Sequence, residues 1–114
     1  MLLTSIILFA VAAVFGLTLI IPLLQNKSVS KSRAVTHGLF AAVALVILII
    51  FSINSETGSP VASIVLFVIA ALGGFVLFSK HLKDGNPGPK GLALVHAGAA
   101  VVGFLILLVF FLSM

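Results

Sequence analysis

The chain contains no cysteine, no tryptophan and no tyrosine, and few of its 114 residues carry a charge. Without cysteine it can form no disulfide bond, thiolate metal site, iron–sulfur cluster or covalent c-type haem attachment. Without Trp and Tyr it lacks the aromatic side chains that usually mark the membrane interfaces, and ten Phe supply the aromatic bulk instead. Any cofactor must therefore be held without a thiol.

Charged residues make up only 7% of the chain, whereas 62% is hydrophobic. A soluble domain needs far more charge on its surface. Four apolar stretches reach the length of about 20 residues that a membrane-spanning helix requires, and they lie roughly at Leu2–Leu24, Ala34–Ile53, Pro60–Ser79 and Gly91–Ser113. We predict an all-α membrane protein with one domain, residues 1–114, built as a bundle of four transmembrane helices. The first stretch has no basic start and no small-residue cleavage site, so we expect a retained helix rather than a signal peptide.

The only two acidic residues, Glu56 and Asp84, lie outside the apolar stretches. In length the chain is similar to the small multidrug exporters, which need a carboxylate inside the membrane to exchange protons for cationic drugs. No apolar stretch here contains Asp, Glu, Lys or Arg, so proton-coupled transport of cations has no obvious carrier. No Ser/His/Asp set, zinc motif or phosphate loop is visible, and hydrolysis is not expected.

All six basic residues lie in two linkers, those after the first and third apolar stretches: Lys27, Lys31, Arg33, Lys80, Lys83 and Lys90. Positive residues stay on the cytoplasmic side of a membrane. This distribution predicts a bacterial cytoplasmic membrane protein with both termini outside and both basic loops in the cytoplasm. The expected partners are membrane lipids, including anionic headgroups, and other membrane subunits of a redox complex. Basic residues that flank spans give no support to a nucleic-acid partner.

The two halves of the chain resemble each other. Residues 5–16 align with residues 63–74 at an offset of 58, and seven of these twelve positions are identical. One extra residue in the second loop changes the offset to 59, which aligns His37 with His96. We interpret residues 1–55 and 59–114 as a direct repeat of a two-helix hairpin, related by a pseudo-two-fold axis along the membrane normal. The alternative is chance similarity between apolar segments that draw on few residue types.

Each copy thus carries one histidine inside a predicted span, where ionisable side chains are costly and usually functional. At helical spacing from each histidine the side chains are small, which leaves room for a flat ligand or for close helix contact. Glycines of two matched Ala-x-x-x-Gly motifs lie at similar depth on the first and third helices. The candidate residues around the two histidines are Ala41, Ala44, Ala100, Gly103, Gly16 and Gly74.

We interpret His37 and His96 as axial ligands of one haem b between the second and fourth helices. Lys31, Arg33 and Lys90 would lie near its propionates. This arrangement resembles b-type cytochromes in general, on the strength of two histidines and their small neighbours. The resemblance implies electron transfer linked to quinol or to a larger redox complex, with quinone as a further candidate ligand.

The alternative is that the small residues serve packing and the histidines lie in the headgroup region. The chain would then be a haem-free accessory or assembly subunit of a larger respiratory or photosynthetic complex. In both cases it is an electron carrier or a subunit more than a stand-alone enzyme. His81 has no histidine counterpart, since Leu23 occupies its repeat position. We expect it at the membrane interface, with a propionate contact or a proton-accepting role at a quinone site as alternatives.

Overall fold

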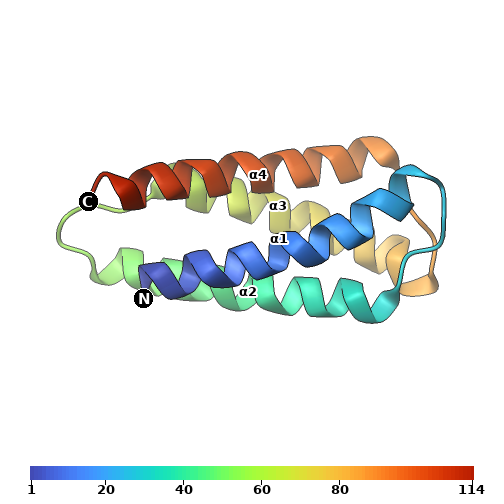
Figure 1. Cartoon of the computed structure of the whole chain (residues 1–114), viewed down its shortest axis with the longest axis horizontal. Helices are drawn as coiled ribbons and strands as arrows, with labels where there is room; N and C mark the ends of the chain where they lie inside the picture. Colours follow the sequence, from blue (N-terminus) through green and yellow to red (C-terminus); the bar gives the residue numbers. More distant parts are fainter.

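The computed structural model describes residues 1–114 as a bundle of four long antiparallel helices (Figure 1). All four are long and apolar enough to span a membrane, as the sequence predicted. A short 3-10 turn, η1, precedes the last helix. The elements in chain order are α1 (Leu2–Leu24), α2 (Lys31–Asn54), α3 (Val61–Lys80), η1 (Leu82–Asp84) and α4 (Lys90–Leu112).

Only the start of α2 differs from its predicted position by more than one residue. It begins at Lys31 and not at Ala34, because the Ser30 side chain caps the helix by accepting a hydrogen bond from the Arg33 amide at 3.3 Å. Lys31 and Arg33 therefore belong to the first helical turn. The glycine- and proline-rich loop before α4 begins at Gly85, whose φ of 80° ends η1 in a conformation that favours glycine.

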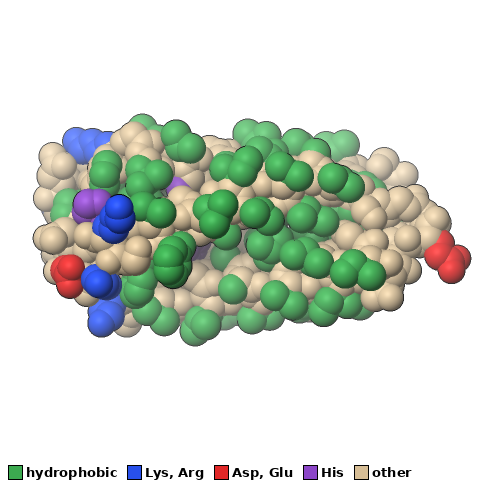
Figure 2. Space-filling model, turned by 180° about the vertical axis from the view of Figure 1, so that it is seen from behind, with side chains coloured by type: hydrophobic (Ala, Val, Ile, Leu, Met, Phe, Trp, Pro, Cys, Tyr) green, Lys and Arg blue, Asp and Glu red, His purple; other side chains and the backbone are tan.

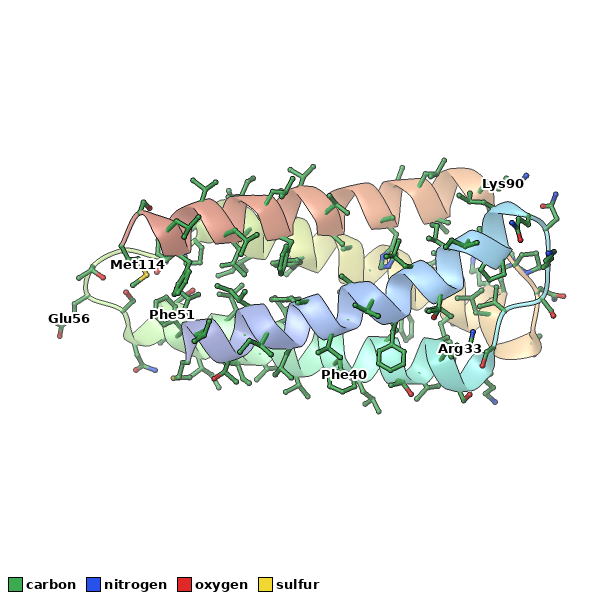
Figure 3. All side chains as sticks on the ribbon, viewed as in Figure 1. Arg33, Phe40, Phe51, Glu56, Lys90 and Met114 are labelled. Atoms are coloured by element: carbon green, nitrogen blue, oxygen red, sulfur yellow. The ribbon has the colours of Figure 1, made fainter.

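The helices pack as two hairpins. In the first hairpin α1 packs against α2, and in the second α3 packs against α4, whereas α1–α4 and α2–α3 contacts are fewer. α1 and α3 lie diagonally opposite each other, as do α2 and α4. One end of the bundle, the basic end, carries both basic linkers, and the other, the terminal end, carries both chain termini and Glu56 (Figures 1 and 3). Figure 2 shows Lys and Arg gathered at the basic end, while apolar side chains are spread along the length of the visible face.

The buried hydrophobic core consists of two separate clusters along the bundle. The terminal cluster contains Leu2, Ile6, Phe9, Ala44, Leu48, Phe67 and Leu107. The basic cluster contains Leu19, Leu23, Val29, Ala34, Leu77, Leu82 and Ala93. Because lipid gives helices no hydrophobic reason to associate, each cluster is held by van der Waals packing and a few hydrogen bonds.

Two aromatic contacts cross the terminal half of the bundle between diagonal helices. Phe9 of α1 stacks on Phe67 of α3 with ring centroids 3.9 Å apart and planes within 9°. Phe51 of α2 meets Phe110 of α4 edge to face at 6.5 Å. The side chains thus join the two hairpins across diagonal helices, whose backbones do not approach each other closely.

Two buried serines in the terminal half of the bundle differ in their hydrogen bonding. Ser5 Oγ donates to the Ala44 carbonyl at 2.9 Å and so links α1 to α2. Ser63 is equally buried, but its hydroxyl has no partner. A buried hydroxyl without a partner loses its hydration and gains nothing in exchange.

We expect Ser5→Ala to lower the free energy of unfolding by about 0.5–1 kcal/mol, because it removes an interhelical hydrogen bond. Ser63→Ala makes the same chemical change at a hydroxyl that has no partner, so stability should stay equal or rise. The measurement is the unfolding midpoint in mixed micelles titrated with SDS. Equal losses in the two variants would contradict the difference in bonding.

Candidate functional site

A layer built around His37 and His96 separates the two core clusters, and we call it the histidine layer. Each histidine lies six residues after the first residue of its helix, Lys31 in α2 and Lys90 in α4. At 1.5 Å per residue this is about 9 Å along the helix from the basic end. The layer is therefore inside the predicted spans, about midway between the basic end of the helices and their middle.

Both imidazoles form the same hydrogen bond to the neighbouring helix of their own hairpin. His37 Nδ1 lies 2.7 Å from the Ala12 carbonyl oxygen, and His96 Nδ1 lies 2.5 Å from that of Ala70. A carbonyl oxygen only accepts, so Nδ1 carries the proton and donates it in both cases. In the neutral ring the lone pair is then on Nε2, the nitrogen free to bind a metal.

Gly16 and Gly74 provide the space that the two rings occupy. A Cβ atom at Gly16 would lie 3.2 Å from His37 Cε1, and one at Gly74 would lie 2.9 Å from His96 Cε1. A larger residue at Gly74 would force the His96 ring or its surroundings to shift, and one at Gly16 would press on the His37 ring. The two Ala-x-x-x-Gly motifs, predicted as points of close helix approach, thus each supply a carbonyl acceptor and the space for an imidazole.

The two histidines meet across the bundle between α2 and α4. Their ring centroids are 6.1 Å apart and their planes are inclined by 81°. Neither Nε2 has a hydrogen-bond partner. Ser63 Oγ is the only completely buried side-chain nitrogen or oxygen that lacks a partner. Each Nε2 is therefore not completely covered by protein atoms.

Other small residues at this level are also incompletely covered. Gly16 lies on the core-facing side of α1 between the buried residues Ala12 and Leu19, but it is only half-buried. Gly74, Ala41 and Ala100 are half-buried as well. These four residues are thus less completely covered than the residues of the two core clusters.

Ala44 and Gly103 lie in the neighbouring, tightly packed layer. Ala44 is fully buried and its carbonyl accepts the Ser5 hydrogen bond. A Cβ at Gly103 would lie 3.2 Å from Leu66 Cβ and 3.4 Å from Phe67. Both residues therefore face the partner helix of their own hairpin, one step from the histidines toward the terminal end.

The candidate propionate partners lie at the basic end. Lys31, Arg33 and Lys90 are all exposed, and Figure 3 shows Arg33 and Lys90 at this same end. His81 is half-buried in the nearby loop, where its ring packs on the backbone of Gly88. It does not belong to the histidine layer.

Chemically, the histidine layer offers two imidazoles and no carboxylate. No group of three or more His, Cys, Asp or Glu side chains in the bundle could hold a metal ion. A metal bound here must therefore bring most of its ligands with it. No known protein family, curated protein or solved structure matches the chain.

Gly74→Ala should destabilise the bundle by about 1–3 kcal/mol, because the new methyl group overlaps the His96 ring. The matched control is Gly38→Ala in α2, where a Cβ meets nothing within 4 Å. That change should leave stability unchanged or raise it by up to about 1 kcal/mol, since alanine is the better helix former. Thermal unfolding in detergent measures both, and a tolerated Gly74→Ala would disprove the tight fit.

Proposed function

We propose that this protein is a small membrane cytochrome b, with His37 and His96 as the axial ligands of one haem. It carries electrons to or from quinol or a larger redox complex. The observation that carries the proposal is the pair of imidazoles, 6.1 Å apart, each with Nδ1 bonded to a helix carbonyl and Nε2 free. Metal-ligating histidines almost always donate their second ring nitrogen in this way.

The separation of the rings agrees with one metal between them. A metal–imidazole bond is about 2 Å long, as for zinc, and the nitrogen is about 1 Å from the centre of its ring. Two imidazoles that bind one metal from opposite sides should therefore have their centroids about 6 Å apart. The observed distance is 6.1 Å. The donor set agrees as well, because a porphyrin supplies four nitrogens and leaves two axial positions for protein ligands.

The small buried residues of the histidine layer also support a flat ligand. Ala12 is the one buried residue of α1 between Phe9 and Leu19, and Ala70 is the one buried residue of α3 between Phe67 and Leu77. Ten residues separate Phe9 from Leu19, or about 15 Å along the helix. A ring system held by the two histidines would therefore meet no large buried side chain of α1 or α3 over this length.

When bound, haem supplies one-electron redox chemistry. The two histidines would fill both of its axial positions, which favours electron transfer over the binding of gases. Lys31, Arg33 and Lys90 are free to extend toward carboxylates at the basic end, where charge-assisted hydrogen bonds hold propionates. Quinol is a suitable electron donor because the exposed surface of the helices is apolar and faces lipid.

We also infer that the two hairpins are copies related by a pseudo-two-fold axis along the bundle. The support comes from the side chains that meet between diagonal helices. Phe9 and Phe67 are 58 residues apart, and His37 and His96 are 59 apart. Phe51 and Phe110 are also 59 apart, so each pair joins corresponding positions of the repeat.

The purified protein should show a reduced-minus-oxidised spectrum of a low-spin b-type haem. His37→Ala and His96→Ala should each abolish it, because one imidazole cannot supply both axial bonds. His81→Ala is the matched control, since His81 lies outside the histidine layer, and its haem content should equal that of the unaltered protein. Full haem content in either of the first two variants would refute the assignment. A protein that never binds haem, and that co-purifies with a larger complex, would support the accessory-subunit alternative.

We further propose that the basic end faces the bacterial cytoplasm and both termini face outward, on the basis of the six basic residues gathered there. A C-terminal alkaline phosphatase fusion after Met114 should be active, because this enzyme folds only outside the cytoplasm. A green fluorescent protein fused at the same point should stay dark. The opposite result would reverse the orientation.

A further inference from the structure

The two hairpins differ in how firmly their helices are joined. In the first hairpin Ser5 Oγ donates to the Ala44 carbonyl at 2.9 Å. Ser63 is the residue 58 positions later, and it is fully buried with no partner. The same side chain therefore joins α1 to α2 but leaves α3 and α4 without that bond.

A second difference lies beside the histidines. Phe15 of α1 stacks on Phe40 of α2, with centroids 5.9 Å apart and planes within 16°. Phe15 directly precedes Gly16, the residue that contacts the His37 ring. Phe40 lies three residues after His37 on the same helix. The corresponding residues of the second hairpin, at offsets of 58 and 59, are Gly73 and Ala99, which carry no ring.

The two differences are independent in chemistry and in position, yet both favour the first hairpin. One is a hydrogen bond near the terminal end, and the other is an aromatic stack at the histidine layer. In addition, Ser63 is buried without a partner for its hydroxyl in the packed bundle, which penalises that arrangement. By these contacts the α3–α4 pairing is the weaker of the two.

Weak pairing bears directly on His96. Its imidazole is on α4, whereas its acceptor, the Ala70 carbonyl, is on α3. A shift of α3 against α4 therefore changes the direction of the ring. His37 is held between α1 and α2, where the Ser5 bond and the Phe15–Phe40 stack oppose such a shift.

We propose that the first hairpin is a preformed half-site, which holds His37 in its ligating direction before the cofactor arrives. The second hairpin is the mobile half, which closes on the cofactor through His96. The identity of the cofactor as haem rests on the proposed function, whereas the difference in rigidity between the hairpins does not. The site would thus fill in a fixed order, with His37 bound first and His96 second.

Paired spin labels can test this order, since the chain has no native cysteine to compete for labelling. Val14 and Val43 are 64% and 50% exposed in the first hairpin, and the corresponding Leu72 and Val102 are 65% and 49% exposed in the second. Each pair is replaced by cysteine in the full chain, labelled and placed in lipid nanodiscs. Dipolar electron paramagnetic resonance then gives the spread of each distance, with and without added haem.

Without haem, the Leu72/Val102 distance should be spread more widely than the Val14/Val43 distance. Added haem should narrow the former and leave the latter unchanged. Equal spreads without haem, or a wider one in the first hairpin, would overturn the proposal. If no haem binds at all, the proposed function fails by itself, and the haem-free comparison still decides the difference in rigidity.

Matched variants then connect the rigidity to the two contacts. Ser5→Ala combined with Phe40→Ala should widen the Val14/Val43 distribution toward that of the second hairpin. Ser63→Ala removes only an unpaired hydroxyl, so the Leu72/Val102 distribution should stay as it is or narrow. A first hairpin that keeps its narrow distribution in the double variant would show that these contacts do not set its rigidity.

Discussion

The hydrogen bond from each imidazole to a helix carbonyl determines how the rest of the histidine layer is arranged. Lipid supplies no partner for a polar ring, so a histidine inside a span must find one on a neighbouring helix. A helical carbonyl already accepts from the amide four residues later, but its second lone pair remains free. Ala12 and Ala70 provide that lone pair, and each ring keeps its second nitrogen, Nε2, without a hydrogen-bond partner.

This arrangement requires small residues where a stable core would have large ones. Gly16 and Gly74 lie inside helices, where glycine is destabilising by up to about 1 kcal/mol relative to alanine. They also interrupt the packing, so that the core forms two clusters and not one. Clusters of large buried side chains lie on both sides of the histidines, and the small residues are confined to the one layer between them.

Hydropathy alone was enough to predict the four helices and nearly all of their ends. The start of α2 was missed because a single side chain, Ser30, caps the helix, and the residue three positions later is Arg33 instead of the usual acidic partner. Helical spacing placed Ala44 and Gly103 on the same helix faces as the histidines. In the structure they lie seven residues from His37 and His96, in the packed layer toward the terminal end.

The carbonyls of Ala12 and Ala70 could not have been predicted as partners of the histidines, since a backbone acceptor is the same in every residue type. The contact between Phe15 and Phe40 could not be predicted either, because the prediction used only positions at which the two copies are similar. These rings occur in one copy only. Similarity between the repeats identifies the two histidines as a matched pair, whereas the different contacts of the two repeats are visible only in the structure.

The loops at the basic end are themselves joined, because the Val29 amide donates to the Gly85 carbonyl at 3.4 Å and both Val29 and Leu82 are buried there. At the opposite end the segment between Asn54 and Val61 connects the hairpins covalently. The two hairpins are therefore joined at both ends of the bundle. If the histidines bind haem as proposed, the haem would enter sideways between the helices from the hydrocarbon phase, and its supply would depend on its partition into the bilayer rather than on its concentration in water.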